Sequence, residues 1–417
     1  MAGQDFTRPR RRIVGSLFAM QSLSSAAVIA SATVLTIIAA DLTGNPALAG
    51  VPSAIIQLSM ALSALLWGTL WDRMGRRNGL AAALLIGLAG SGLAAAATEF
   101  GAVWAFALGI IGIGAMRAGT LMARFVAAEV SAPDARGRAI SIVVWAGTVG
   151  AVLGPLLVAP SGAWASSLGL NELTGPILIT VPLIGLASAV TFAGLRPEPA
   201  KLAKLIEGEN PRAEVDEQST RSISQLIRLP GVYVAVITVA MAQAAMIMLM
   251  GITALYMRDL GHSLGDISVV FAAHTLGMFA FAPISGSLSD RLGRGPVMIV
   301  GTLIIVLSGI LAPASPAVVV IAAGLFLLGF GWSFSFVAGS ALLSDQLTPT
   351  ERSKTQGAND MLIGLASGLG SLASGVLYAG LGYWAAGLAI GLLSAVGFAF
   401  STWWTLSHRV PHPAAAD

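Results

Sequence analysis

The chain has 417 residues, of which 56% are hydrophobic and only 10% are charged. An ordinary soluble domain contains about 25% charged residues, so this composition excludes a globule whose whole surface faces water. The absence of cysteine excludes a disulfide framework, a thiolate nucleophile and a cysteine-ligated metal site.

Apolar stretches of about 20 residues recur along the chain, and each is long enough to cross a hydrocarbon core of about 30 Å as a helix. The sequence therefore predicts an all-α polytopic membrane protein. The first stretch, from Ile13, follows the basic segment RPRRR without a convincing cleavage site, which favours a retained span over a signal peptide. Charge clusters and Pro/Gly turns delimit twelve predicted spans: 13–40, 51–71, 79–98, 102–126, 138–160, 174–194, 231–257, 265–288, 296–312, 316–343, 356–380 and 382–406.

Most of the 23 lysines and arginines fall before span 1 or after an even-numbered span. Only Arg258 falls in an opposite loop, whereas Arg117 and Arg124 lie inside span 4. By the positive-inside rule, we expect a multi-pass protein of the cell membrane with both termini in the cytoplasm. Topology and attraction to anionic lipid head groups explain the net charge of +3, and we expect no nucleic-acid partner.

One long polar stretch, residues 195–230, divides the chain into two six-helix halves, residues 1–194 and 231–417. We predict that this stretch is a cytoplasmic linker. Within it, SISQLIRL places its apolar residues on one helical face, which favours a short helix at the membrane interface. A mobile tether is the alternative for the acidic first part of the linker.

The loop after the second span of each half carries the same charged pattern, GTLWDRMGRR from Gly68 and GSLSDRLGRG from Gly286. The identical residues are Gly68, Leu70, Asp72, Arg73, Gly75 and Arg76 in the first loop and Gly286, Leu288, Asp290, Arg291, Gly293 and Arg294 in the second. A second correspondence follows the fourth span of each half, where Pro133, Arg136 and Arg138 match Pro349, Arg352 and Lys354. The halves are therefore predicted to be copies of one six-helix unit.

The doubled pattern G-x-L-x-D-R-x-G-R resembles the A motif of the major facilitator superfamily. This resemblance implies two pseudo-symmetric six-helix bundles around a cavity that opens alternately to either side of the membrane. It also implies that Asp72 caps the positive end of span 11, near Gln356, when the cytoplasmic gate shuts. Asp290 is expected to cap the positive end of span 5 in the corresponding way.

The other motif residues have implied roles in the same gate. Arg73 and Arg76 would orient Asp72 and pair with nearby acids. Gly68 and Gly286 would permit close helix approach, and Gly75 and Gly293 a tight turn. The alternative is that these charges only fix loop shape and topology.

Span 5 contains GTVGAVLGPLLVAP, in which Gly150, Gly154 and Pro155 resemble the motif g-x-x-x-G-P-x-x-G-G of proton-exchanging exporters in this family. Val158 and Ala159 replace the last two glycines, so the match is partial. We expect the small residues to pack span 5 tightly on a helix of the other half. Ordinary packing of a glycine-rich bundle is the alternative.

No G-x-x-x-x-G-K-[ST] loop or H-E-x-x-H motif is present, so the sequence predicts no ATP drive, no enzyme, no cofactor and no metal. The expected partners are a small-molecule substrate, protons and the lipid bilayer, and we expect a monomer. The leading hypothesis is a proton-coupled exporter of small hydrophobic or amphiphilic molecules. The alternative is a symporter or facilitator that imports a small organic, possibly anionic, metabolite.

Few ionisable residues lie deep in the predicted spans. His274 in span 8 is either a coupling or binding group or a hydrogen-bonded neutral core histidine. Arg117 in span 4 requires a partner or a watery cavity, and it could attract an anionic solute or belong to a buried pair. Asp360 could be protonatable or could cap span 11 together with Asn359. The remaining candidate cavity groups are Gln21, Gln57, Trp145, Gln243 and Trp332.

Overall fold

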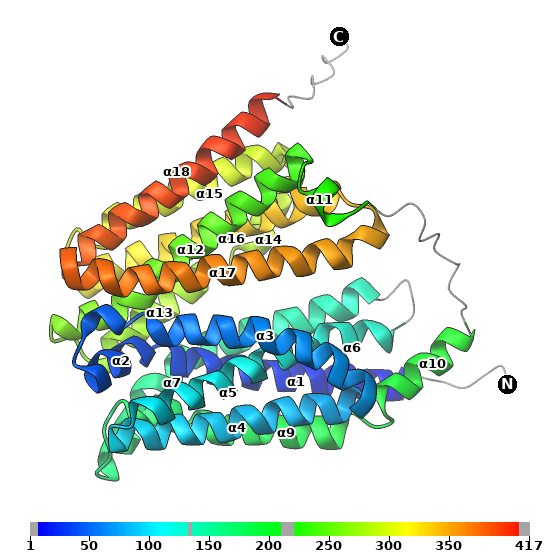
Figure 1. Cartoon of the computed structure of the whole chain (residues 1–417), viewed down its shortest axis with the longest axis horizontal. Coiled ribbons are helices and arrows are strands. Elements are labelled where there is room, and N and C mark those ends of the chain that lie inside the picture. The colour runs from blue at the N-terminus through cyan, green and yellow to red at the C-terminus, as the bar shows by residue number, and fades with distance from the viewer. Residues whose placement is uncertain (1–6, 132–135, 210–220, 408–417) are drawn as a thin grey trace. The chain divides into compact units, whose positions relative to one another are not determined.

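A computed structural model describes residues 7–131, 136–209 and 221–407 of the chain (Figure 1). All elements in these ranges are helices, and they form twelve candidate membrane spans, which confirms the predicted fold class. The first half contains α1 (Thr7–Ala32), α2 (Leu35–Thr43), η1 (Pro46–Leu48), α3 (Val51–Met74), α4 (Arg76–Phe100), α5 (Val103–Leu121), α6 (Ala123–Glu129), α7 (Arg136–Ser167), α8 (Thr174–Leu178) and α9 (Thr180–Gly194). The linker and second half contain α10 (Pro199–Glu209), α11 (Ile223–Leu226), α12 (Pro230–Asp259), α13 (Leu264–Phe279), α14 (Ala282–Leu292), α15 (Arg294–Leu311), α16 (Val318–Asp345), α17 (Pro349–Leu381) and α18 (Tyr383–Ser407).

Proline does not interrupt the fifth span. Helix α7 runs without a break through Pro155 and Pro160, although each proline removes one backbone donor from the helix. The eighth span does break, because α13 ends at Phe279 and α14 restarts with Pro283 in its first turn. Proline is well tolerated there, since the first N–H groups of a helix have no partner within the helix.

Helix α17 begins earlier than predicted. Its membrane span, Gly357–Leu381, agrees with the predicted span, but the helix extends back to Pro349. The segment T-P-T-E starts it, since the Glu351 side chain accepts a hydrogen bond from the backbone N–H of Thr348 over 3.0 Å. The expectation that the positive end of this helix lies near Gln356 is therefore wrong.

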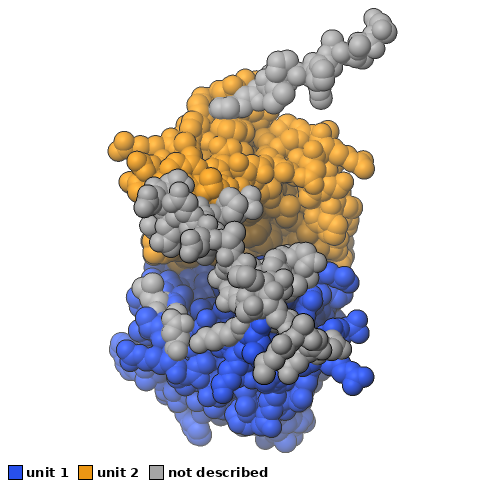
Figure 2. All heavy atoms as spheres, turned by 90° about the vertical axis from the view of Figure 1, so that its right-hand side faces the viewer, with its two compact units in different colours: residues 1–215, 251–272, 371–380 blue, residues 216–250, 273–370, 381–417 orange. Residues whose placement is uncertain are grey.

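The backbone groups into two compact units, coloured separately in Figure 2. Unit 1 contains residues 1–215, 251–272 and 371–380, and unit 2 contains the rest of the chain. Unit 1 thus contains the first half together with end segments of α12, α13 and α17. From the sequence, these segments were expected to belong to the second half. Within unit 1 these segments are held by polar contacts, among them the ion pair of Arg258 with Asp41.

Two further hydrogen bonds involve the same segments, one to the first half and one between two of the segments. The Ser371 hydroxyl donates to the Gly50 carbonyl oxygen over 2.8 Å. The Tyr378 hydroxyl donates to an Asp259 carboxylate oxygen over 2.5 Å.

The core of unit 1 combines large apolar side chains with glycine contacts between helices. Trp71 is 2% exposed, and the Trp67 indole N–H donates to the Ala115 carbonyl oxygen over 2.8 Å. A β-carbon at Gly90 in α4 would lie 2.6 Å from the carbonyl oxygen of Gly109 in α5. These two helices approach so closely because neither carries a side chain at that point.

Unit 2 is built in the same way. Its buried cluster includes Met298 and Phe334, and a β-carbon at Gly301 would lie 2.7 Å from the backbone nitrogen of Ser335. A buried contact of 3.2 Å joins the hydroxyl groups of Thr238 and Ser401. Small and hydroxyl residues therefore set the helix spacing in both units.

We predict that Gly90→Ala destabilises the protein, because its methyl group would collide with backbone atoms of α5. Overpacking of this kind costs about 1–3 kcal/mol. Gly92→Ala is the matched control, since a β-carbon there meets no atom within 4 Å and alanine favours the helix. Thermal denaturation in detergent measures both variants, and equal melting temperatures would contradict this account of the packing.

Candidate functional site

Each half contains the same ion pair at one end of its bundle. The Arg76 Nε and Nη2 groups both donate to the Glu129 carboxylate over 3.0 Å. In the second half, the Arg294 Nε group donates to an Asp345 carboxylate oxygen, also over 3.0 Å. The last arginine of each repeated motif thus binds the acid that ends the fourth span of its own half.

A glycine with a positive φ angle precedes each of these arginines. The φ angle is +82° at Gly75 and +90° at Gly293, a region that other residues rarely adopt. After the first turn, the Glu198 carboxylate accepts hydrogen bonds from the backbone N–H groups of Arg76 and Arg77, over 2.6 and 3.2 Å. A carboxylate at the start of α4 stabilises the helix, because the free N–H groups of that helix end carry partial positive charge.

The structure describes some of the other motif residues but not all of them. The side chain of Asp72, like Gly68, lies outside the described residues, so capping of span 11 by Asp72 stays a prediction. The side chain of Asp290 is 71% exposed and pairs with Arg294. A β-carbon at Gly286 would lie 4.0 Å from its nearest neighbour, so close packing does not require that glycine. Two motif arginines are exposed: Arg73 and Arg291.

The start of α17 contains an ion pair between a buried carboxylate and a partly exposed arginine, which the sequence did not predict. Glu351 is only 1% exposed and accepts two hydrogen bonds of 2.8 Å from the Arg221 guanidinium group. The hydrogen bond from Arg221 holds the pKa of the Glu351 carboxyl well below its ordinary value of 4.5, and it raises the pKa of Arg221. The T-P-T-E capping signal could have located Glu351, but nothing local indicates Arg221.

The glycines of the exporter-like motif face α1, within unit 1. A β-carbon at Gly150 would lie 2.6 Å from the backbone nitrogen of Ala26, and one at Gly154 would lie 2.9 Å from Ile29 Cβ. The prediction that these glycines pack on a helix of the other half is therefore wrong. Their side-chain-free faces receive the backbone of the first span instead.

Arg117 is a half-buried cation near the C-terminal end of α5, in the middle of the fourth span, Val103–Glu129. In the part of the chain that the structure describes, its guanidinium group has no hydrogen bond or ion pair. A charge is costly at this depth of a membrane span. Of the two alternatives for Arg117, the absence of a partner among the described residues argues against a buried pair.

His274 is 1% exposed in α13, and its Nδ1 lies 2.9 Å from the Leu325 carbonyl oxygen in α16. Its Nε2 atom is buried without a hydrogen-bond partner. A neutral ring that donates from Nδ1 fits these contacts, whereas a protonated ring would bury a second N–H without an acceptor. The geometry favours the structural alternative for His274.

The predicted polar candidates form one direct pair. The Trp332 indole N–H donates to the Gln243 side-chain oxygen over 2.7 Å, and the Trp332 ring stacks on Phe336 at a centroid distance of 4.7 Å. All three side chains are half-buried members of unit 2. They combine an aromatic face on α16 with one amide group on α12.

The remaining candidates are more scattered. Trp145 is 62% exposed, and its ring centroid lies 5.9 Å from that of Phe18. Gln21 donates weakly to Ser25, over 3.3 Å, and Gln57 is buried. Asp360 is exposed in the interior of α17, so the idea that it caps the start of that helix is wrong.

Comparison with known proteins identifies the family. The sequence model of the Major Facilitator Superfamily matches residues 17–256 and 234–417. The chain belongs to this superfamily. It is therefore a secondary transporter and not an enzyme, and it carries small molecules across a membrane.

The relatives agree with this family. The chain is 34% identical to the uncharacterised MFS-type transporter YdeG of Bacillus subtilis (strain 168), over 90% of this chain and 87% of the relative. It is 28% identical to the riboflavin transporter RfnT of Brucella anthropi, over 90% of each chain. The solved structure of a D-xylose–proton symporter shares the fold, with a TM-score of 0.70, 19% identity, and coverage of 94% of this chain and 97% of that one.

We predict that Glu351→Gln lowers the melting temperature most at neutral pH. Because the folded state lowers the pKa of Glu351, its carboxylate stabilises the protein above the ordinary pKa of 4.5, and this stabilisation is lost as the pH falls towards the lower folded pKa. The difference between wild type and variant should therefore shrink below about pH 4.5. Thermal denaturation in detergent across pH measures it, with the exposed Glu172→Gln as control. A difference independent of pH would contradict the assignment.

Proposed function

We propose that this transporter exports small aromatic or amphiphilic molecules in exchange for protons, by alternating access, across the cell membrane with both chain termini in the cytoplasm. The proposed substrate class is based on the Trp332–Gln243 pair beside Phe336. An aromatic face with an adjacent amide suits a planar ligand that also accepts or donates hydrogen bonds.

The proposed energy source is the proton gradient. Each proton that returns through a potential of about 150 mV releases roughly 3.5 kcal/mol. At 1.36 kcal/mol per tenfold, this sustains concentration ratios of about several hundred, so one proton per substrate is sufficient. Asp360, an exposed carboxylate in the interior of α17, is the acidic candidate for proton binding.

The proposed outward direction rests on the partial resemblance of Gly150, Gly154 and Pro155 to the exporter motif. The packing of both glycines on α1 explains why small residues are needed there, but it does not depend on direction. A second candidate function is import of a small anionic metabolite. Arg117, which has no partner among the described residues, favours it because an unpaired guanidinium group can bind a carboxylate.

Proteoliposomes with an acid-loaded interior test the proposal. Riboflavin and ethidium are suitable probes, because both are fluorescent and planar and one is the named substrate of a relative. We expect at least one probe to accumulate inside as protons leave, with a rise in internal pH reported by a trapped dye. Accumulation only when the exterior is acid would overturn export and support the import alternative.

Two variants connect this assay to the candidate site. Trp332→Phe keeps an aromatic ring over Phe336 but removes the N–H group, and Gln243→Leu removes the acceptor. Each should raise the KM for the transported probe several-fold, because loss of one hydrogen bond costs about 0.5–1.5 kcal/mol. Trp384→Phe, on the 49% exposed Trp384 of α18, is the matched control. Equal effects in all three would remove the pair from the site.

We predict that His274→Ala lowers stability without changing the pH profile of transport. The substitution removes the hydrogen bond between the buried His274 ring and the Leu325 carbonyl oxygen, which costs about 0.5–1.5 kcal/mol. Initial rates of probe transport across pH, together with melting temperatures, measure both effects. A flattened pH profile in a stably folded variant would instead assign proton coupling to His274.

A further inference from the structure

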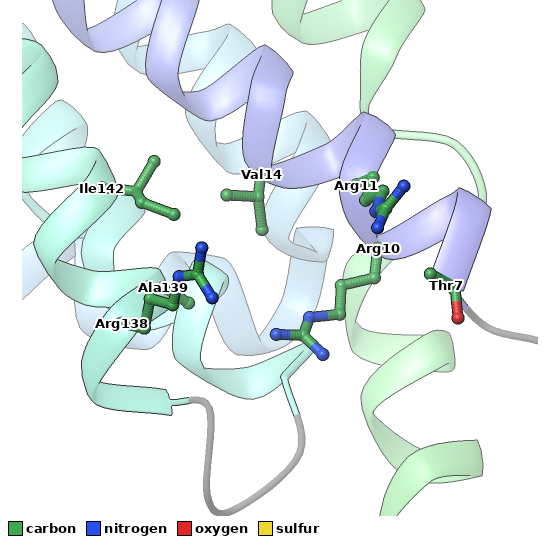
Figure 3. A pocket seen from close by; sticks show the side chains of 7 residues that line it. All are labelled: Thr7, Arg10, Arg11, Val14, Arg138, Ala139 and Ile142. Atoms are coloured by element: carbon green, nitrogen blue, oxygen red, sulfur yellow. The ribbon is translucent and has the colours of Figure 1, made fainter.

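The N-terminal ends of α1 and α7 enclose a cavity of about 380 Å³ in unit 1 (Figure 3). Its lining includes three arginines and three apolar residues: Arg10, Arg11, Arg138, Val14, Ala139 and Ile142. Figure 3 shows the guanidinium groups of Arg10 and Arg138 on either side of the same gap, with Val14 and Ile142 further along the two helices. The cavity therefore has a basic mouth and an apolar wall.

Among the described residues, no acidic residue lines this cavity and its arginines have no ion pair. Two acids of unit 1, at the end of α6 and just before α10, are engaged by other groups, since Glu129 binds Arg76 and Glu198 caps α4. The neighbouring Arg12 is also engaged, because it donates to the Ala193 carbonyl oxygen over 2.7 Å. Within the described part of the chain, three positive charges thus line a space without a counter-charge, and an anion would stabilise it.

The helix ends add to this positive potential. Helix α1 begins at Thr7 and α7 at Arg136, so both helices direct the positive ends of their dipoles towards the cavity region. A guanidinium group can bind a phosphate through two parallel hydrogen bonds. A cluster of arginines without a paired carboxylate therefore favours a bound phosphate. We propose that this cavity binds a phosphate group, either in the head group of an anionic phospholipid or as free phosphate.

The apolar wall and the position along the spans fit an amphiphilic phosphate. The arginines lie at the first residues of the first and fifth membrane spans, which begin at Thr7 and Arg138. Basic residues at this level of a span contact lipid head groups, while their aliphatic stems cover apolar surface. A phosphate held there connects the ends of α1 and α7, which pack together further along at Gly150.

Binding to the purified full-length chain in neutral detergent tests this site. The probes are dioctanoyl phosphatidylglycerol, dioctanoyl phosphatidylcholine and sodium phosphate, followed by native mass spectrometry and thermal shift. We expect saturable binding of a phosphate-bearing anion, weakened at least tenfold in the double variant Arg10→Gln/Arg138→Gln. The matched control is Arg8→Gln/Arg228→Gln, which removes the same charge from exposed arginines that do not line the cavity.

Ile142→Glu provides a second variant if the double variant does not fold. Ile142 is 36% exposed, so the new carboxylate can fill the basic mouth while every arginine stays in place, and binding should be lost. Binding of phosphatidylglycerol alone identifies a lipid site, and binding of sodium phosphate identifies a site for a soluble anion. Equal binding of phosphatidylcholine, or equal losses in the cavity and control variants, would overturn the proposal.

Discussion

Inside a bilayer there is no water to satisfy a free backbone group, and apolar side chains gain little by exchanging lipid for one another. Close contact between helix backbones is then the interaction on which the rest of this structure depends. Gly90 against Gly109, Gly150 against α1, and Gly301 against α16 all provide it. The abundance of glycine in the chain, 49 residues, thus has a packing role that outweighs its poor helix propensity.

Once glycine contacts set the spacing of the spans, charged groups are left mainly at the helix ends. There the two halves keep the same chemistry, since Arg76 with Glu129 corresponds to Arg294 with Asp345. Each pair links the loop after the second span to the end of the fourth span in its own half. The duplication thus conserves a bond that ties two loops or span ends together within each half.

The parts of this fold that depend on length, composition and turn chemistry could be predicted from the sequence. Twelve spans and the turns at Gly75 and Gly293 follow from apolar runs and charged loops. The rotation of a helix about its own axis could not be predicted, because glycine is compatible with every neighbour. For that reason Gly150 was assigned to the wrong partner helix. The bond between Gln243 and Trp332 joins two spans far apart in the chain, and no local pattern encodes it.

Among the described residues, two groups of arginines have no paired carboxylate. They lie at different depths along the membrane spans, and their proposed roles differ accordingly. Arg76, Arg221 and Arg294 are each satisfied by a carboxylate of this chain. Arg117 in mid-span and the Arg10–Arg138 cavity at the span ends lack one among the described residues. A cation without a counter-charge is costlier in the low-dielectric mid-span than at the boundary. A mobile solute at Arg117 and a resident phosphate at the cavity would each supply the negative charge that the described residues do not place there.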